Sequence, residues 1–252
     1  MHHPALPRQP RQPLLRLPSA PPYHACYLPG ASDSLVIAFA SIGHDPARPP
    51  SPEFIGSATA GGRAGLFISD ASRSWGDAGD FAAMLDQALA AVRERQPVTR
   101  ILTLGQSMGG FLALVAASLA PASLAPVEAV LALSPQYAVA PWAGETRWPE
   151  WTARLEHFRY PTAPLPPGAR ITLMHGLADD SAQALRFALQ PGTDHVLFPG
   201  LTHSGLAPHL RARGVLPGLI DAALAGDRRR LLRIAASAGG RLRQRLADQL
   251  PR

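Results

Sequence analysis

The chain has 252 residues, enough for one domain with a sizeable core, and 46% of them are hydrophobic against 17% charged. This balance excludes a chain that is disordered throughout. A mean hydropathy of +0.02, without an apolar run near ~18 residues, is unlike a membrane-spanning protein. The single cysteine, Cys26, excludes an intrachain disulfide framework and a cysteine-based zinc site. The start of the chain does not resemble a secretory signal, so we expect a cytoplasmic protein.

The positive charge is concentrated at the end of the chain. All 24 basic residues are arginine, which excludes lysine Schiff-base chemistry and the lysine-containing P-loop motif. Residues 1–226 carry 16 arginines and 16 acidic residues, whereas residues 227–252 carry eight arginines and two acidic residues. Because the net charge of +6 lies in the last 26 residues and the rest is neutral, we do not expect nucleic-acid binding.

The chain divides into three parts. Seven prolines lie within the first 22 residues, so we expect a Pro-rich, extended and solvated arm over residues 1–25. Over residues 26–226, short apolar runs alternate with helical stretches, which predicts an α/β domain with a mostly parallel central sheet flanked by helices. The predicted strands span 35–41, 65–70, 100–104, 129–133, 171–175 and 195–198, and the clearest predicted helices span 81–95 and 108–119.

An aromatic excursion separates the fourth and fifth predicted strands. Residues 137–168 hold Trp142, Trp148 and Trp151 among six prolines. This segment is either a loop whose aromatic side chains cover the sheet edge or a small wall above the strand ends that carries specificity. On the second interpretation, Trp142 is a candidate substrate-binding residue.

The basic extension, residues 227–252, places leucine and alanine at helical intervals on both sides of Gly239 and Gly240. The pattern predicts two short basic amphipathic helices. The simpler interpretation is that their apolar faces dock on the domain. The alternative is contact with a membrane surface or an acidic partner.

The strongest chemical signal is a G-x-S-x-G motif formed by Gly105-Gln106-Ser107-Met108-Gly109. It lies between a predicted strand and a predicted helix, the context in which such a serine occupies a strained turn and is presented as a nucleophile. The N-terminus of the following helix would favour negative charge there. The alternative is a merely structural Gly-Ser turn.

A serine hydroxyl is a poor nucleophile unless a base takes its proton. The sequence has nine histidines, and sheet geometry indicates which of them can serve as that base. Catalytic groups meet at the carboxyl ends of parallel strands. His195 opens its strand and lies at the wrong end, whereas His203 follows the last strand. We therefore predict His203 as the general base, with His209 as the reserve and His175 as a packed histidine.

The motif, its context and this residue order resemble the α/β-hydrolase superfamily, over roughly residues 34–224. Members carry the acid after the penultimate core strand and the histidine after the last, and here HGLADD and LTHSGL stand in those places. The resemblance implies a Ser-His-Asp triad. The spacing from Gly176 favours Asp179 over Asp180, and the other aspartate would cap the next helix.

The same resemblance implies an oxyanion hole. One donor would be the backbone N–H of Met108, directly after the nucleophile. The second comes, in the resembled family, from the loop after the first predicted strand. The chain departs from the common His-Gly sequence there, so Ser41 and Ile42 are both candidates, and we name Ser41.

A further likeness involves residues 66–75, LFISDASRSW, together with SMGG at the nucleophile. Both are similar to a lesser-known branch of the superfamily that is often associated with bacterial cell-surface glycans. The likeness implies that Ser72, Arg73 and Trp75 line the site, with Arg73 gripping an anionic or hydroxyl-rich substrate. The alternative is a structural turn.

Together these patterns predict a serine hydrolase of the α/β-hydrolase fold that cleaves a carboxylic ester or thioester through an acyl-enzyme. An acyltransferase, a peptidase and a non-catalytic binding protein remain alternatives. The sequence holds neither a dinucleotide fingerprint nor an H-E-x-x-H metal motif. We therefore expect no cofactor and no metal, and a small-molecule or glycan ester as the substrate.

Overall fold

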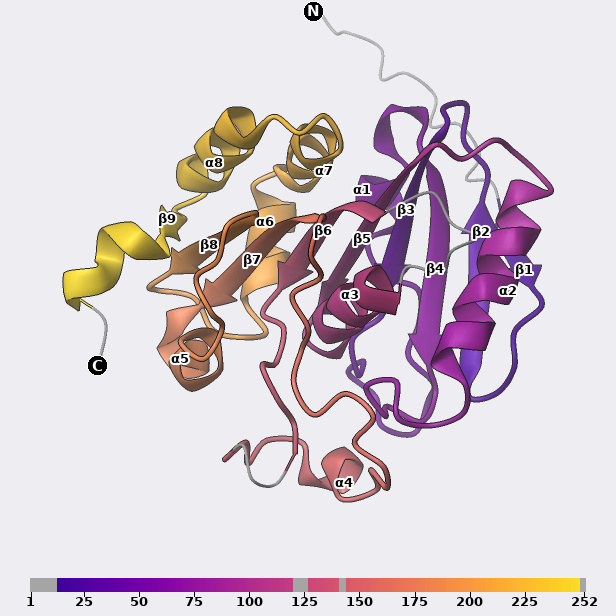
Figure 1. Cartoon of the computed structure of the whole chain (residues 1–252), viewed down its shortest axis with the longest axis horizontal. Helices are drawn as coiled ribbons and strands as arrows, with labels where there is room; N and C mark the ends of the chain where they lie inside the picture. Colours follow the sequence, from indigo (N-terminus) through magenta and orange to yellow (C-terminus); the bar gives the residue numbers. More distant parts are fainter. Residues whose placement is uncertain (1–12, 120–126, 141–143, 250–252) are drawn as a thin grey trace, which may run out of the picture.

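The computed structural model describes residues 13–119, 127–140 and 144–249 of the chain (Figure 1). Within these residues nine strands form one sheet in the order β1-β2-β4-β3-β5-β6-β7-β8-β9. The six strands from β4 to β8 in that order are parallel, and the outer strands are antiparallel. The predicted mixed α/β class with a mostly parallel sheet is confirmed. The strands are β1 (Leu15–Leu17), β2 (Tyr23–Leu28), β3 (Ser34–Phe39), β4 (Ala64–Asp70), β5 (Arg100–Gln106), β6 (Val127–Leu133), β7 (Arg170–Gly176), β8 (Thr193–Phe198) and β9 (Arg241–Leu242).

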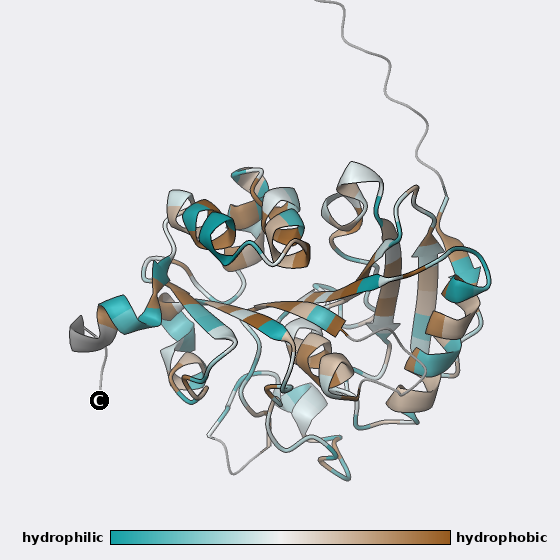
Figure 2. Ribbon diagram, turned by 45° about the horizontal axis from the view of Figure 1, so that its top comes forward, coloured by the Kyte–Doolittle hydropathy of each residue, from teal (hydrophilic) through white to brown (hydrophobic). Residues whose placement is uncertain are grey.

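Helices cover both faces of the sheet (Figure 2). On one face lie α2 (Phe81–Arg93) and α3 (Met108–Leu119), and on the other lie α1 (Ile55–Ala58), α7 (Leu216–Leu224) and α8 (Arg228–Ser237). The shorter helical segments are η1 (Ala60–Gly62), α4 (Pro149–Thr152), α5 (Leu177–Ala184), α6 (Leu206–Ala212) and η3 (Arg243–Gln249).

The strand β3 shows why the central strands are apolar runs. All six of its residues are buried. Because side chains alternate along a strand, Leu35 and Ile37 belong to the hydrophobic cluster that includes α2 and α3, whereas Val36 and Ala38 belong to the cluster that includes α1 and α7. A strand buried on both faces needs an apolar residue at every position, so its sequence shows no alternation.

The N-terminal part of the described chain differs from the prediction. From Leu15 onward it belongs to the sheet, because β1 pairs with β2 and β2 pairs with β4. Leu17, Tyr23 and Ala25 are buried, so the expected boundary of the arm at residue 25 falls inside β2. The physical reason is the alternation of buried and half-buried residues along β2, which is typical of an antiparallel strand near a sheet edge. Residues 1–12 of the predicted arm lie outside the described residues.

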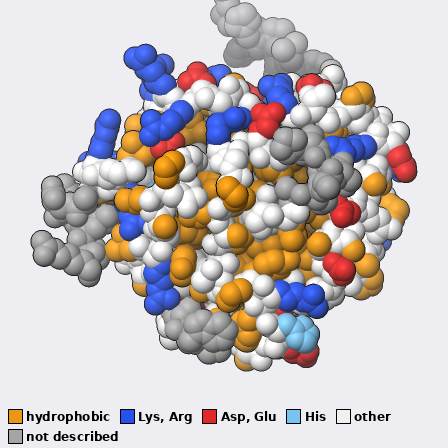
Figure 3. Space-filling view, in the orientation of Figure 1, with side chains coloured by type: hydrophobic (Ala, Val, Ile, Leu, Met, Phe, Trp, Pro, Cys, Tyr) orange, Lys and Arg blue, Asp and Glu red, His pale blue; other side chains and the backbone are white. Residues whose placement is uncertain are grey.

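The basic extension docks on the domain through α8 and β9. Leu231 and Ala235 of α8 are buried, and β9 pairs with β8. Gly240 permits this approach, because a Cβ atom there would lie 2.6 Å from Cγ1 of Val196. In place of a second amphipathic helix, η3 follows β9. Arginine side chains gather on the surface over this part of the molecule (Figure 3), and those of α8 are exposed: Arg228, Arg229, Arg230 and Arg233.

The aromatic excursion leaves the sheet after β6 and carries α4, at the bottom of Figure 1. Trp151 is buried against the α3 side of the core, and Trp148 packs partly buried against the same cluster. The excursion is therefore packed on the domain rather than extended from it. Trp142, the predicted substrate-binding residue, lies outside the described residues.

Candidate active site

Ser107 lies on a sharp turn between β5 and α3. Its φ of 57° is in the left-handed region, which is uncommon for a residue with a side chain and indicates local strain. The turn is possible because its neighbours are small. A Cβ atom on Gly105 would lie 2.2 Å from the carbonyl carbon of Gly109, and one on Gly109 would lie 2.2 Å from the carbonyl oxygen of Phe39. The G-x-S-x-G pattern thus reflects backbone crossing at this point.

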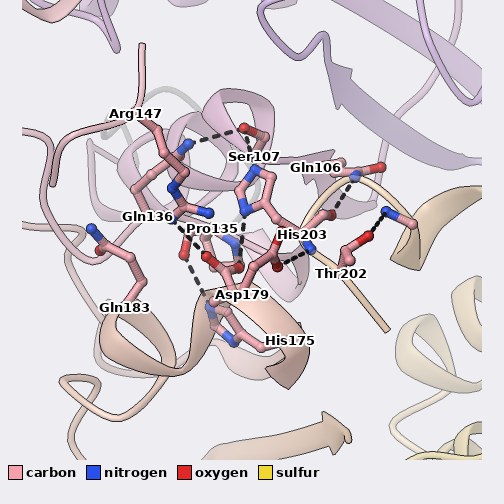
Figure 4. A network of polar contacts seen from close by, with 12 residues as sticks. Gln106, Ser107, Pro135, Gln136, Arg147, His175, Asp179, Gln183, Thr202 and His203 are labelled. Carbon is pink, nitrogen blue, oxygen red and sulfur yellow. Dashed lines mark hydrogen bonds and ion pairs between the residues drawn. The ribbon is translucent and has the colours of Figure 1, made fainter. Parts of the chain in front are cut away.

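His203 lies in the loop after β8, with its Nε2 2.8 Å from Oγ of Ser107 (Figure 4). The side-chain amide of Gln106, the residue before Ser107, donates to the carbonyl of His203 at 2.9 Å and ties this loop to the turn. The reserve candidate, His209, contacts the carbonyl of Ala238 at 2.8 Å instead. The structure therefore brings Ser107 and His203 together and places His209 elsewhere.

The carboxylate beside the imidazole is that of Asp180, and the preference for Asp179 is corrected. Oδ2 of Asp180 lies 2.9 Å from Nδ1 of His203, whereas Oδ1 of exposed Asp179 accepts a hydrogen bond from the backbone N–H of His203 at 2.6 Å. The reason is that α5 begins at Leu177, before both aspartates. Adjacent residues of a helix point about 100° apart, so only one carboxylate faces the ring and the other holds its backbone.

Asp180 is 1% exposed, yet its surroundings favour the ionised form. Burial raises the pKa of this carboxyl. The hydrogen bond and charge of His203, together with Arg147, lower the pKa by more than burial raises it, so the net shift is downward. Arg147 donates to Oδ1 of Asp180 at 2.9 Å and to Oε2 of Glu145 at 2.7 Å. A buried carboxylate is costly unless paired, and Arg147 supplies a permanent positive charge.

A side-chain amide also contacts Ser107. Nε2 of Gln136, in the loop after β6, lies 2.9 Å from Oγ of Ser107, and Figure 4 shows this amide on the side of the hydroxyl away from Gln106. Oε1 of Gln136 accepts from the indole N–H of Trp75 at 3.2 Å. Both residues are buried, at 0% and 2% exposure. No pattern in the sequence pointed to Gln136, which follows a strand as an ordinary polar loop residue.

Arg73 and Trp75 do not take the substrate-contact role expected of them. Arg73 is 3% exposed, and neither residue lines the cleft at Ser107. The guanidinium of Arg73 donates to the carbonyls of Ile42, Asp45 and Arg48, and its cation also lies over the ring of Trp151. A guanidinium satisfied by three carbonyls has little capacity left for a substrate. The interpretation of this segment as a structural turn is therefore correct for Arg73.

The expected oxyanion donors are the residue after Ser107 and the loop after β3. Met108 is the first residue of α3, where backbone N–H groups have no partner within the helix. Ser41 and Ile42 line the same cleft as Ser107. The hydroxyl of Ser41 donates to Oε1 of Glu53 at 2.6 Å, so the backbone N–H is the group that Ser41 can offer.

An open cleft of about 860 Å³ leads to Ser107 and His203. Its wall includes the loop after β3, the start of α6 and the aromatic excursion, which contributes Trp148. The ring of Trp148 lies 5.1 Å from that of His203, and the guanidinium of Arg147 lies over it at 4.6 Å. Both polar and apolar residues line the cleft, and they include Ser41, His44, Glu53, Phe54, Ser57, Ser204, Arg211 and Leu216.

Two further histidines form a buried pair behind the site. Nδ1 of His175 lies 2.9 Å from Nε2 of His195, and Nε2 of His175 lies 3.0 Å from the carbonyl of Pro135. Burial lowers the pKa of His175 to about 4 and that of His195 well below its ordinary value. Arg243 of the basic extension faces Nδ1 of His195 at 3.4 Å. His175 is thus a packed histidine, as expected.

Neither a metal centre nor a membrane span is seen in the described part of the chain. Across residues 13–119, 127–140 and 144–249, no group of three or more His, Cys, Asp or Glu side chains is arranged to hold a metal ion. Over the same residues, each helix is too short or too polar to cross a bilayer.

Comparison with known proteins supports the fold. Neither a family model nor a curated protein matches the chain, but solved structures do. The capsule O-acetyltransferase of Neisseria meningitidis serogroup A is 13% identical with a TM-score of 0.53, over 79% of this chain and 92% of that one. A Pyrobaculum calidifontis esterase is 16% identical with a TM-score of 0.54, over 85% of each chain.

A Pyrococcus horikoshii acylaminoacyl peptidase is 15% identical with a TM-score of 0.60, over 86% of this chain and 42% of that one. At identities this low the similarity establishes architecture rather than activity. The chain has the α/β-hydrolase fold, a fold shared by hydrolases, esterases and an acyltransferase.

The buried histidine pair predicts a loss of stability in mild acid. Unfolding returns the two side chains to a pKa near 6.5, so between about pH 4 and 6.5 the unfolded chain binds more protons. The free energy of unfolding should therefore fall as the pH decreases through this window, by up to about 1.4 kcal/mol per pH unit for each histidine. Urea denaturation from pH 7.5 to 5 measures the slope. His195→Gln should flatten it, and an unchanged slope in that variant contradicts the assignment.

Proposed function

We propose that this protein is a serine hydrolase that cleaves a carboxylic ester or thioester through an acyl-enzyme, with Ser107, His203 and Asp180 as its triad. One observation carries the proposal, which is the continuous contact from Oγ of Ser107 to Nε2 of His203 at 2.8 Å and from Nδ1 of His203 to Asp180 at 2.9 Å. The three groups follow the carboxyl ends of three separate parallel strands, β5, β7 and β8.

In the proposed reaction, Oγ of Ser107 forms a bond to the substrate carbonyl carbon while its proton passes to Nε2 of His203. Asp180 holds the ring and stabilises the imidazolium that results. The backbone N–H groups of Met108 and of Ser41 or Ile42 stabilise the oxyanion. The leaving alcohol or thiol takes the proton from His203, and water then repeats the sequence to release the acid and regenerate Ser107.

The cleft favours a polar ester as the substrate. Hydroxyl, carboxyl, imidazole and guanidinium groups line it beside the ring of Trp148, and an aromatic face with polar groups around it suits the apolar face and hydroxyls of a sugar. We therefore propose a small-molecule or glycan ester. An ester is preferred to an amide because an alkoxide leaving group demands less of the general acid.

The nucleophile assignment is tested with a fluorophosphonate probe and an ester panel. The wild-type protein should be labelled at Ser107 and should hydrolyse p-nitrophenyl esters or acetylated sugars. Ser107→Ala should abolish labelling and lower kcat by about 10⁴-fold or more, because the covalent route is lost. Ser118→Ala is the matched control, since Ser118 lies in α3 and its hydroxyl bonds the carbonyl of Val115. Folded wild-type protein that neither labels nor hydrolyses would instead be a non-catalytic binding protein.

The two neighbouring aspartates give a matched pair of variants. Asp180→Asn should lower kcat by about 10³- to 10⁴-fold, because an amide cannot stabilise the imidazolium and favours the wrong tautomer. Asp179→Asn should cost less than about tenfold, since an amide oxygen still accepts the backbone N–H of His203. Steady-state kinetics on purified variants compare them, and equal losses, or a larger loss for Asp179→Asn, would show that Asp180 is not the acid.

Acyl transfer to an alcohol acceptor is the second candidate function. It is favoured by the size of the cleft, about 860 Å³, which leaves room for an acceptor beside the acyl group, and by the fold shared with a capsule O-acetyltransferase. If acyl transfer is the function, acetyl groups from p-nitrophenyl acetate should pass to added oligosaccharide acceptors faster than to water. Mass spectrometry of the acceptor, beside the rate of acetate release, measures this partition. Acetate release alone supports the hydrolase.

A further inference from the structure

We propose that the Gln136 amide is a catalytic group that aims the hydroxyl of Ser107 at His203 and donates to Oγ when that oxygen leaves, and that Trp75 is the positioning residue that orients it. The inference rests on the proposed function and extends it to two residues outside the triad. It depends on the contacts of Gln136 with Ser107 and Trp75, at 2.9 and 3.2 Å.

The direction of every hydrogen bond in this chain follows from the indole. The N–H of Trp75 can only donate, so the atom of Gln136 that faces it must be the carbonyl oxygen Oε1. The amino group of Gln136 then faces Ser107 and donates to Oγ. With one lone pair of Oγ engaged, its own hydrogen is directed to its other partner, Nε2 of His203.

The same reasoning fixes the tautomer of the imidazole. Nε2 of His203 accepts from Ser107 and therefore carries no proton, so Nδ1 carries it and donates to Asp180. Arg147 donates to the other oxygen of Asp180. The hydrogen bonds run in one direction from Trp75 to Asp180, and this is the protonation state from which Ser107 can be deprotonated.

Several contacts hold the Trp75 and Gln136 side chains in place. The turn before Trp75 is fixed by the buried carboxylate of Asp70, which accepts from the backbone N–H and hydroxyl of Ser74 at 2.7 and 2.8 Å. The loop before Gln136 is fixed by the carbonyl of Pro135, which lies 3.0 Å from Nε2 of buried His175. Fixed polar groups contribute more to catalysis than mobile ones, because they need no reorganisation during reaction.

The two halves of the reaction use the amide differently. During acylation the bond from Oγ to the acyl carbon forms and the proton leaves for His203, so the amide mainly orients the hydroxyl. During deacylation, His203 takes a proton from water as the water oxygen bonds to that carbon, and the bond from the carbon to Oγ then breaks. Negative charge then collects on Oγ until His203 returns a proton to it. A donor on Oγ stabilises this charge, so the larger effect of Gln136 falls on deacylation.

The test compares four variants by pre-steady-state hydrolysis of p-nitrophenyl acetate. Gln136→Met removes the donor and should slow deacylation by about 10- to 100-fold, so that acyl-enzyme accumulates as a burst of p-nitrophenol. Gln136→Glu keeps the shape but offers an acceptor that competes with His203 for the hydroxyl proton, and both steps should slow. Trp75→Phe keeps the packing but frees the amide to turn, with a smaller loss.

Gln96→Glu is the matched control. Gln96 is a half-buried glutamine whose side-chain amide forms hydrogen bonds with Tyr27, Gly30 and Ser32, next to the amino-terminal end of β3. Its rates should stay within about twofold of wild type. A variant that merely misfolds lowers the burst amplitude per chain and leaves the deacylation rate constant unchanged, which separates damage from catalysis. If Gln136→Met has the same rates as the control in an enzyme that depends on Ser107, the role of Gln136 is overturned and the proposed hydrolase function stands.

A second measurement does not depend on activity. In ¹⁵N-histidine-labelled protein near neutral pH, Nε2 of His203 should show the shift of an unprotonated nitrogen and Nδ1 that of a protonated one, with assignment by loss of the signals in His203→Gln. Gln136→Glu should move the Nε2 shift and Gln96→Glu should not. A protonated Nε2 in wild type, or no movement in Gln136→Glu, rejects the inference even if the protein proves not to be a hydrolase.

Discussion

The carboxylate of Asp180 is the group on which the rest of the site depends. It is buried, and a buried anion is tolerated only when donors and positive charge surround it. Here one oxygen faces His203 and the other faces Arg147. These partners come from the loop after β8 and from the aromatic excursion. Because the buried charge needs both partners, its contacts connect these two distant segments to α5. The tautomer of His203 follows from this arrangement, and Trp148, the residue after Arg147, lies beside the imidazole with the two ring centroids 5.1 Å apart.

The segment of residues 66–75 contacts the neighbours of Ser107 and does not line the cleft. Its two distinctive side chains point inward. Arg73 donates hydrogen bonds to carbonyls of the loop that carries Ser41 and Ile42, and Trp75 donates to Gln136 and orients its amide. The loop that carries the proposed second oxyanion donor and the amide that contacts Oγ of Ser107 are thus both held by one turn. A short sequence can contribute to a site in this way without lining it, because burial turns its donors toward the backbone and polar groups around them.

The parts of the site that could be predicted are those with a local signature. Continuous apolar runs identified the parallel strands, the glycines around Ser107 identified the turn, and the position of His203 after the last strand followed from sheet topology. The choice between Asp179 and Asp180 depended on where α5 begins, and helix boundaries have no sharp signal in a stretch such as HGLADD. Arg147 and Gln136 lie in irregular segments, where the direction of a side chain is decided by packing and not by any periodic pattern.

The basic extension illustrates how composition and structure answer different questions. Its arginines account for the whole net charge, which at first suggests a surface for an acidic partner. Yet Arg243 points inward, donates to the carbonyls of Leu185 and Phe187, and faces the ring of His195. Because it is always charged, its N–H can only donate, so His195 presents an acceptor to it and donates to His175, which donates to the carbonyl of Pro135. This second directed chain ends one residue before Gln136. The extension therefore contributes to holding the loop that contacts Ser107. The contacts from Arg243 to His195 and from His195 to His175 require neutral histidines, because Nδ1 of each ring must accept a hydrogen bond.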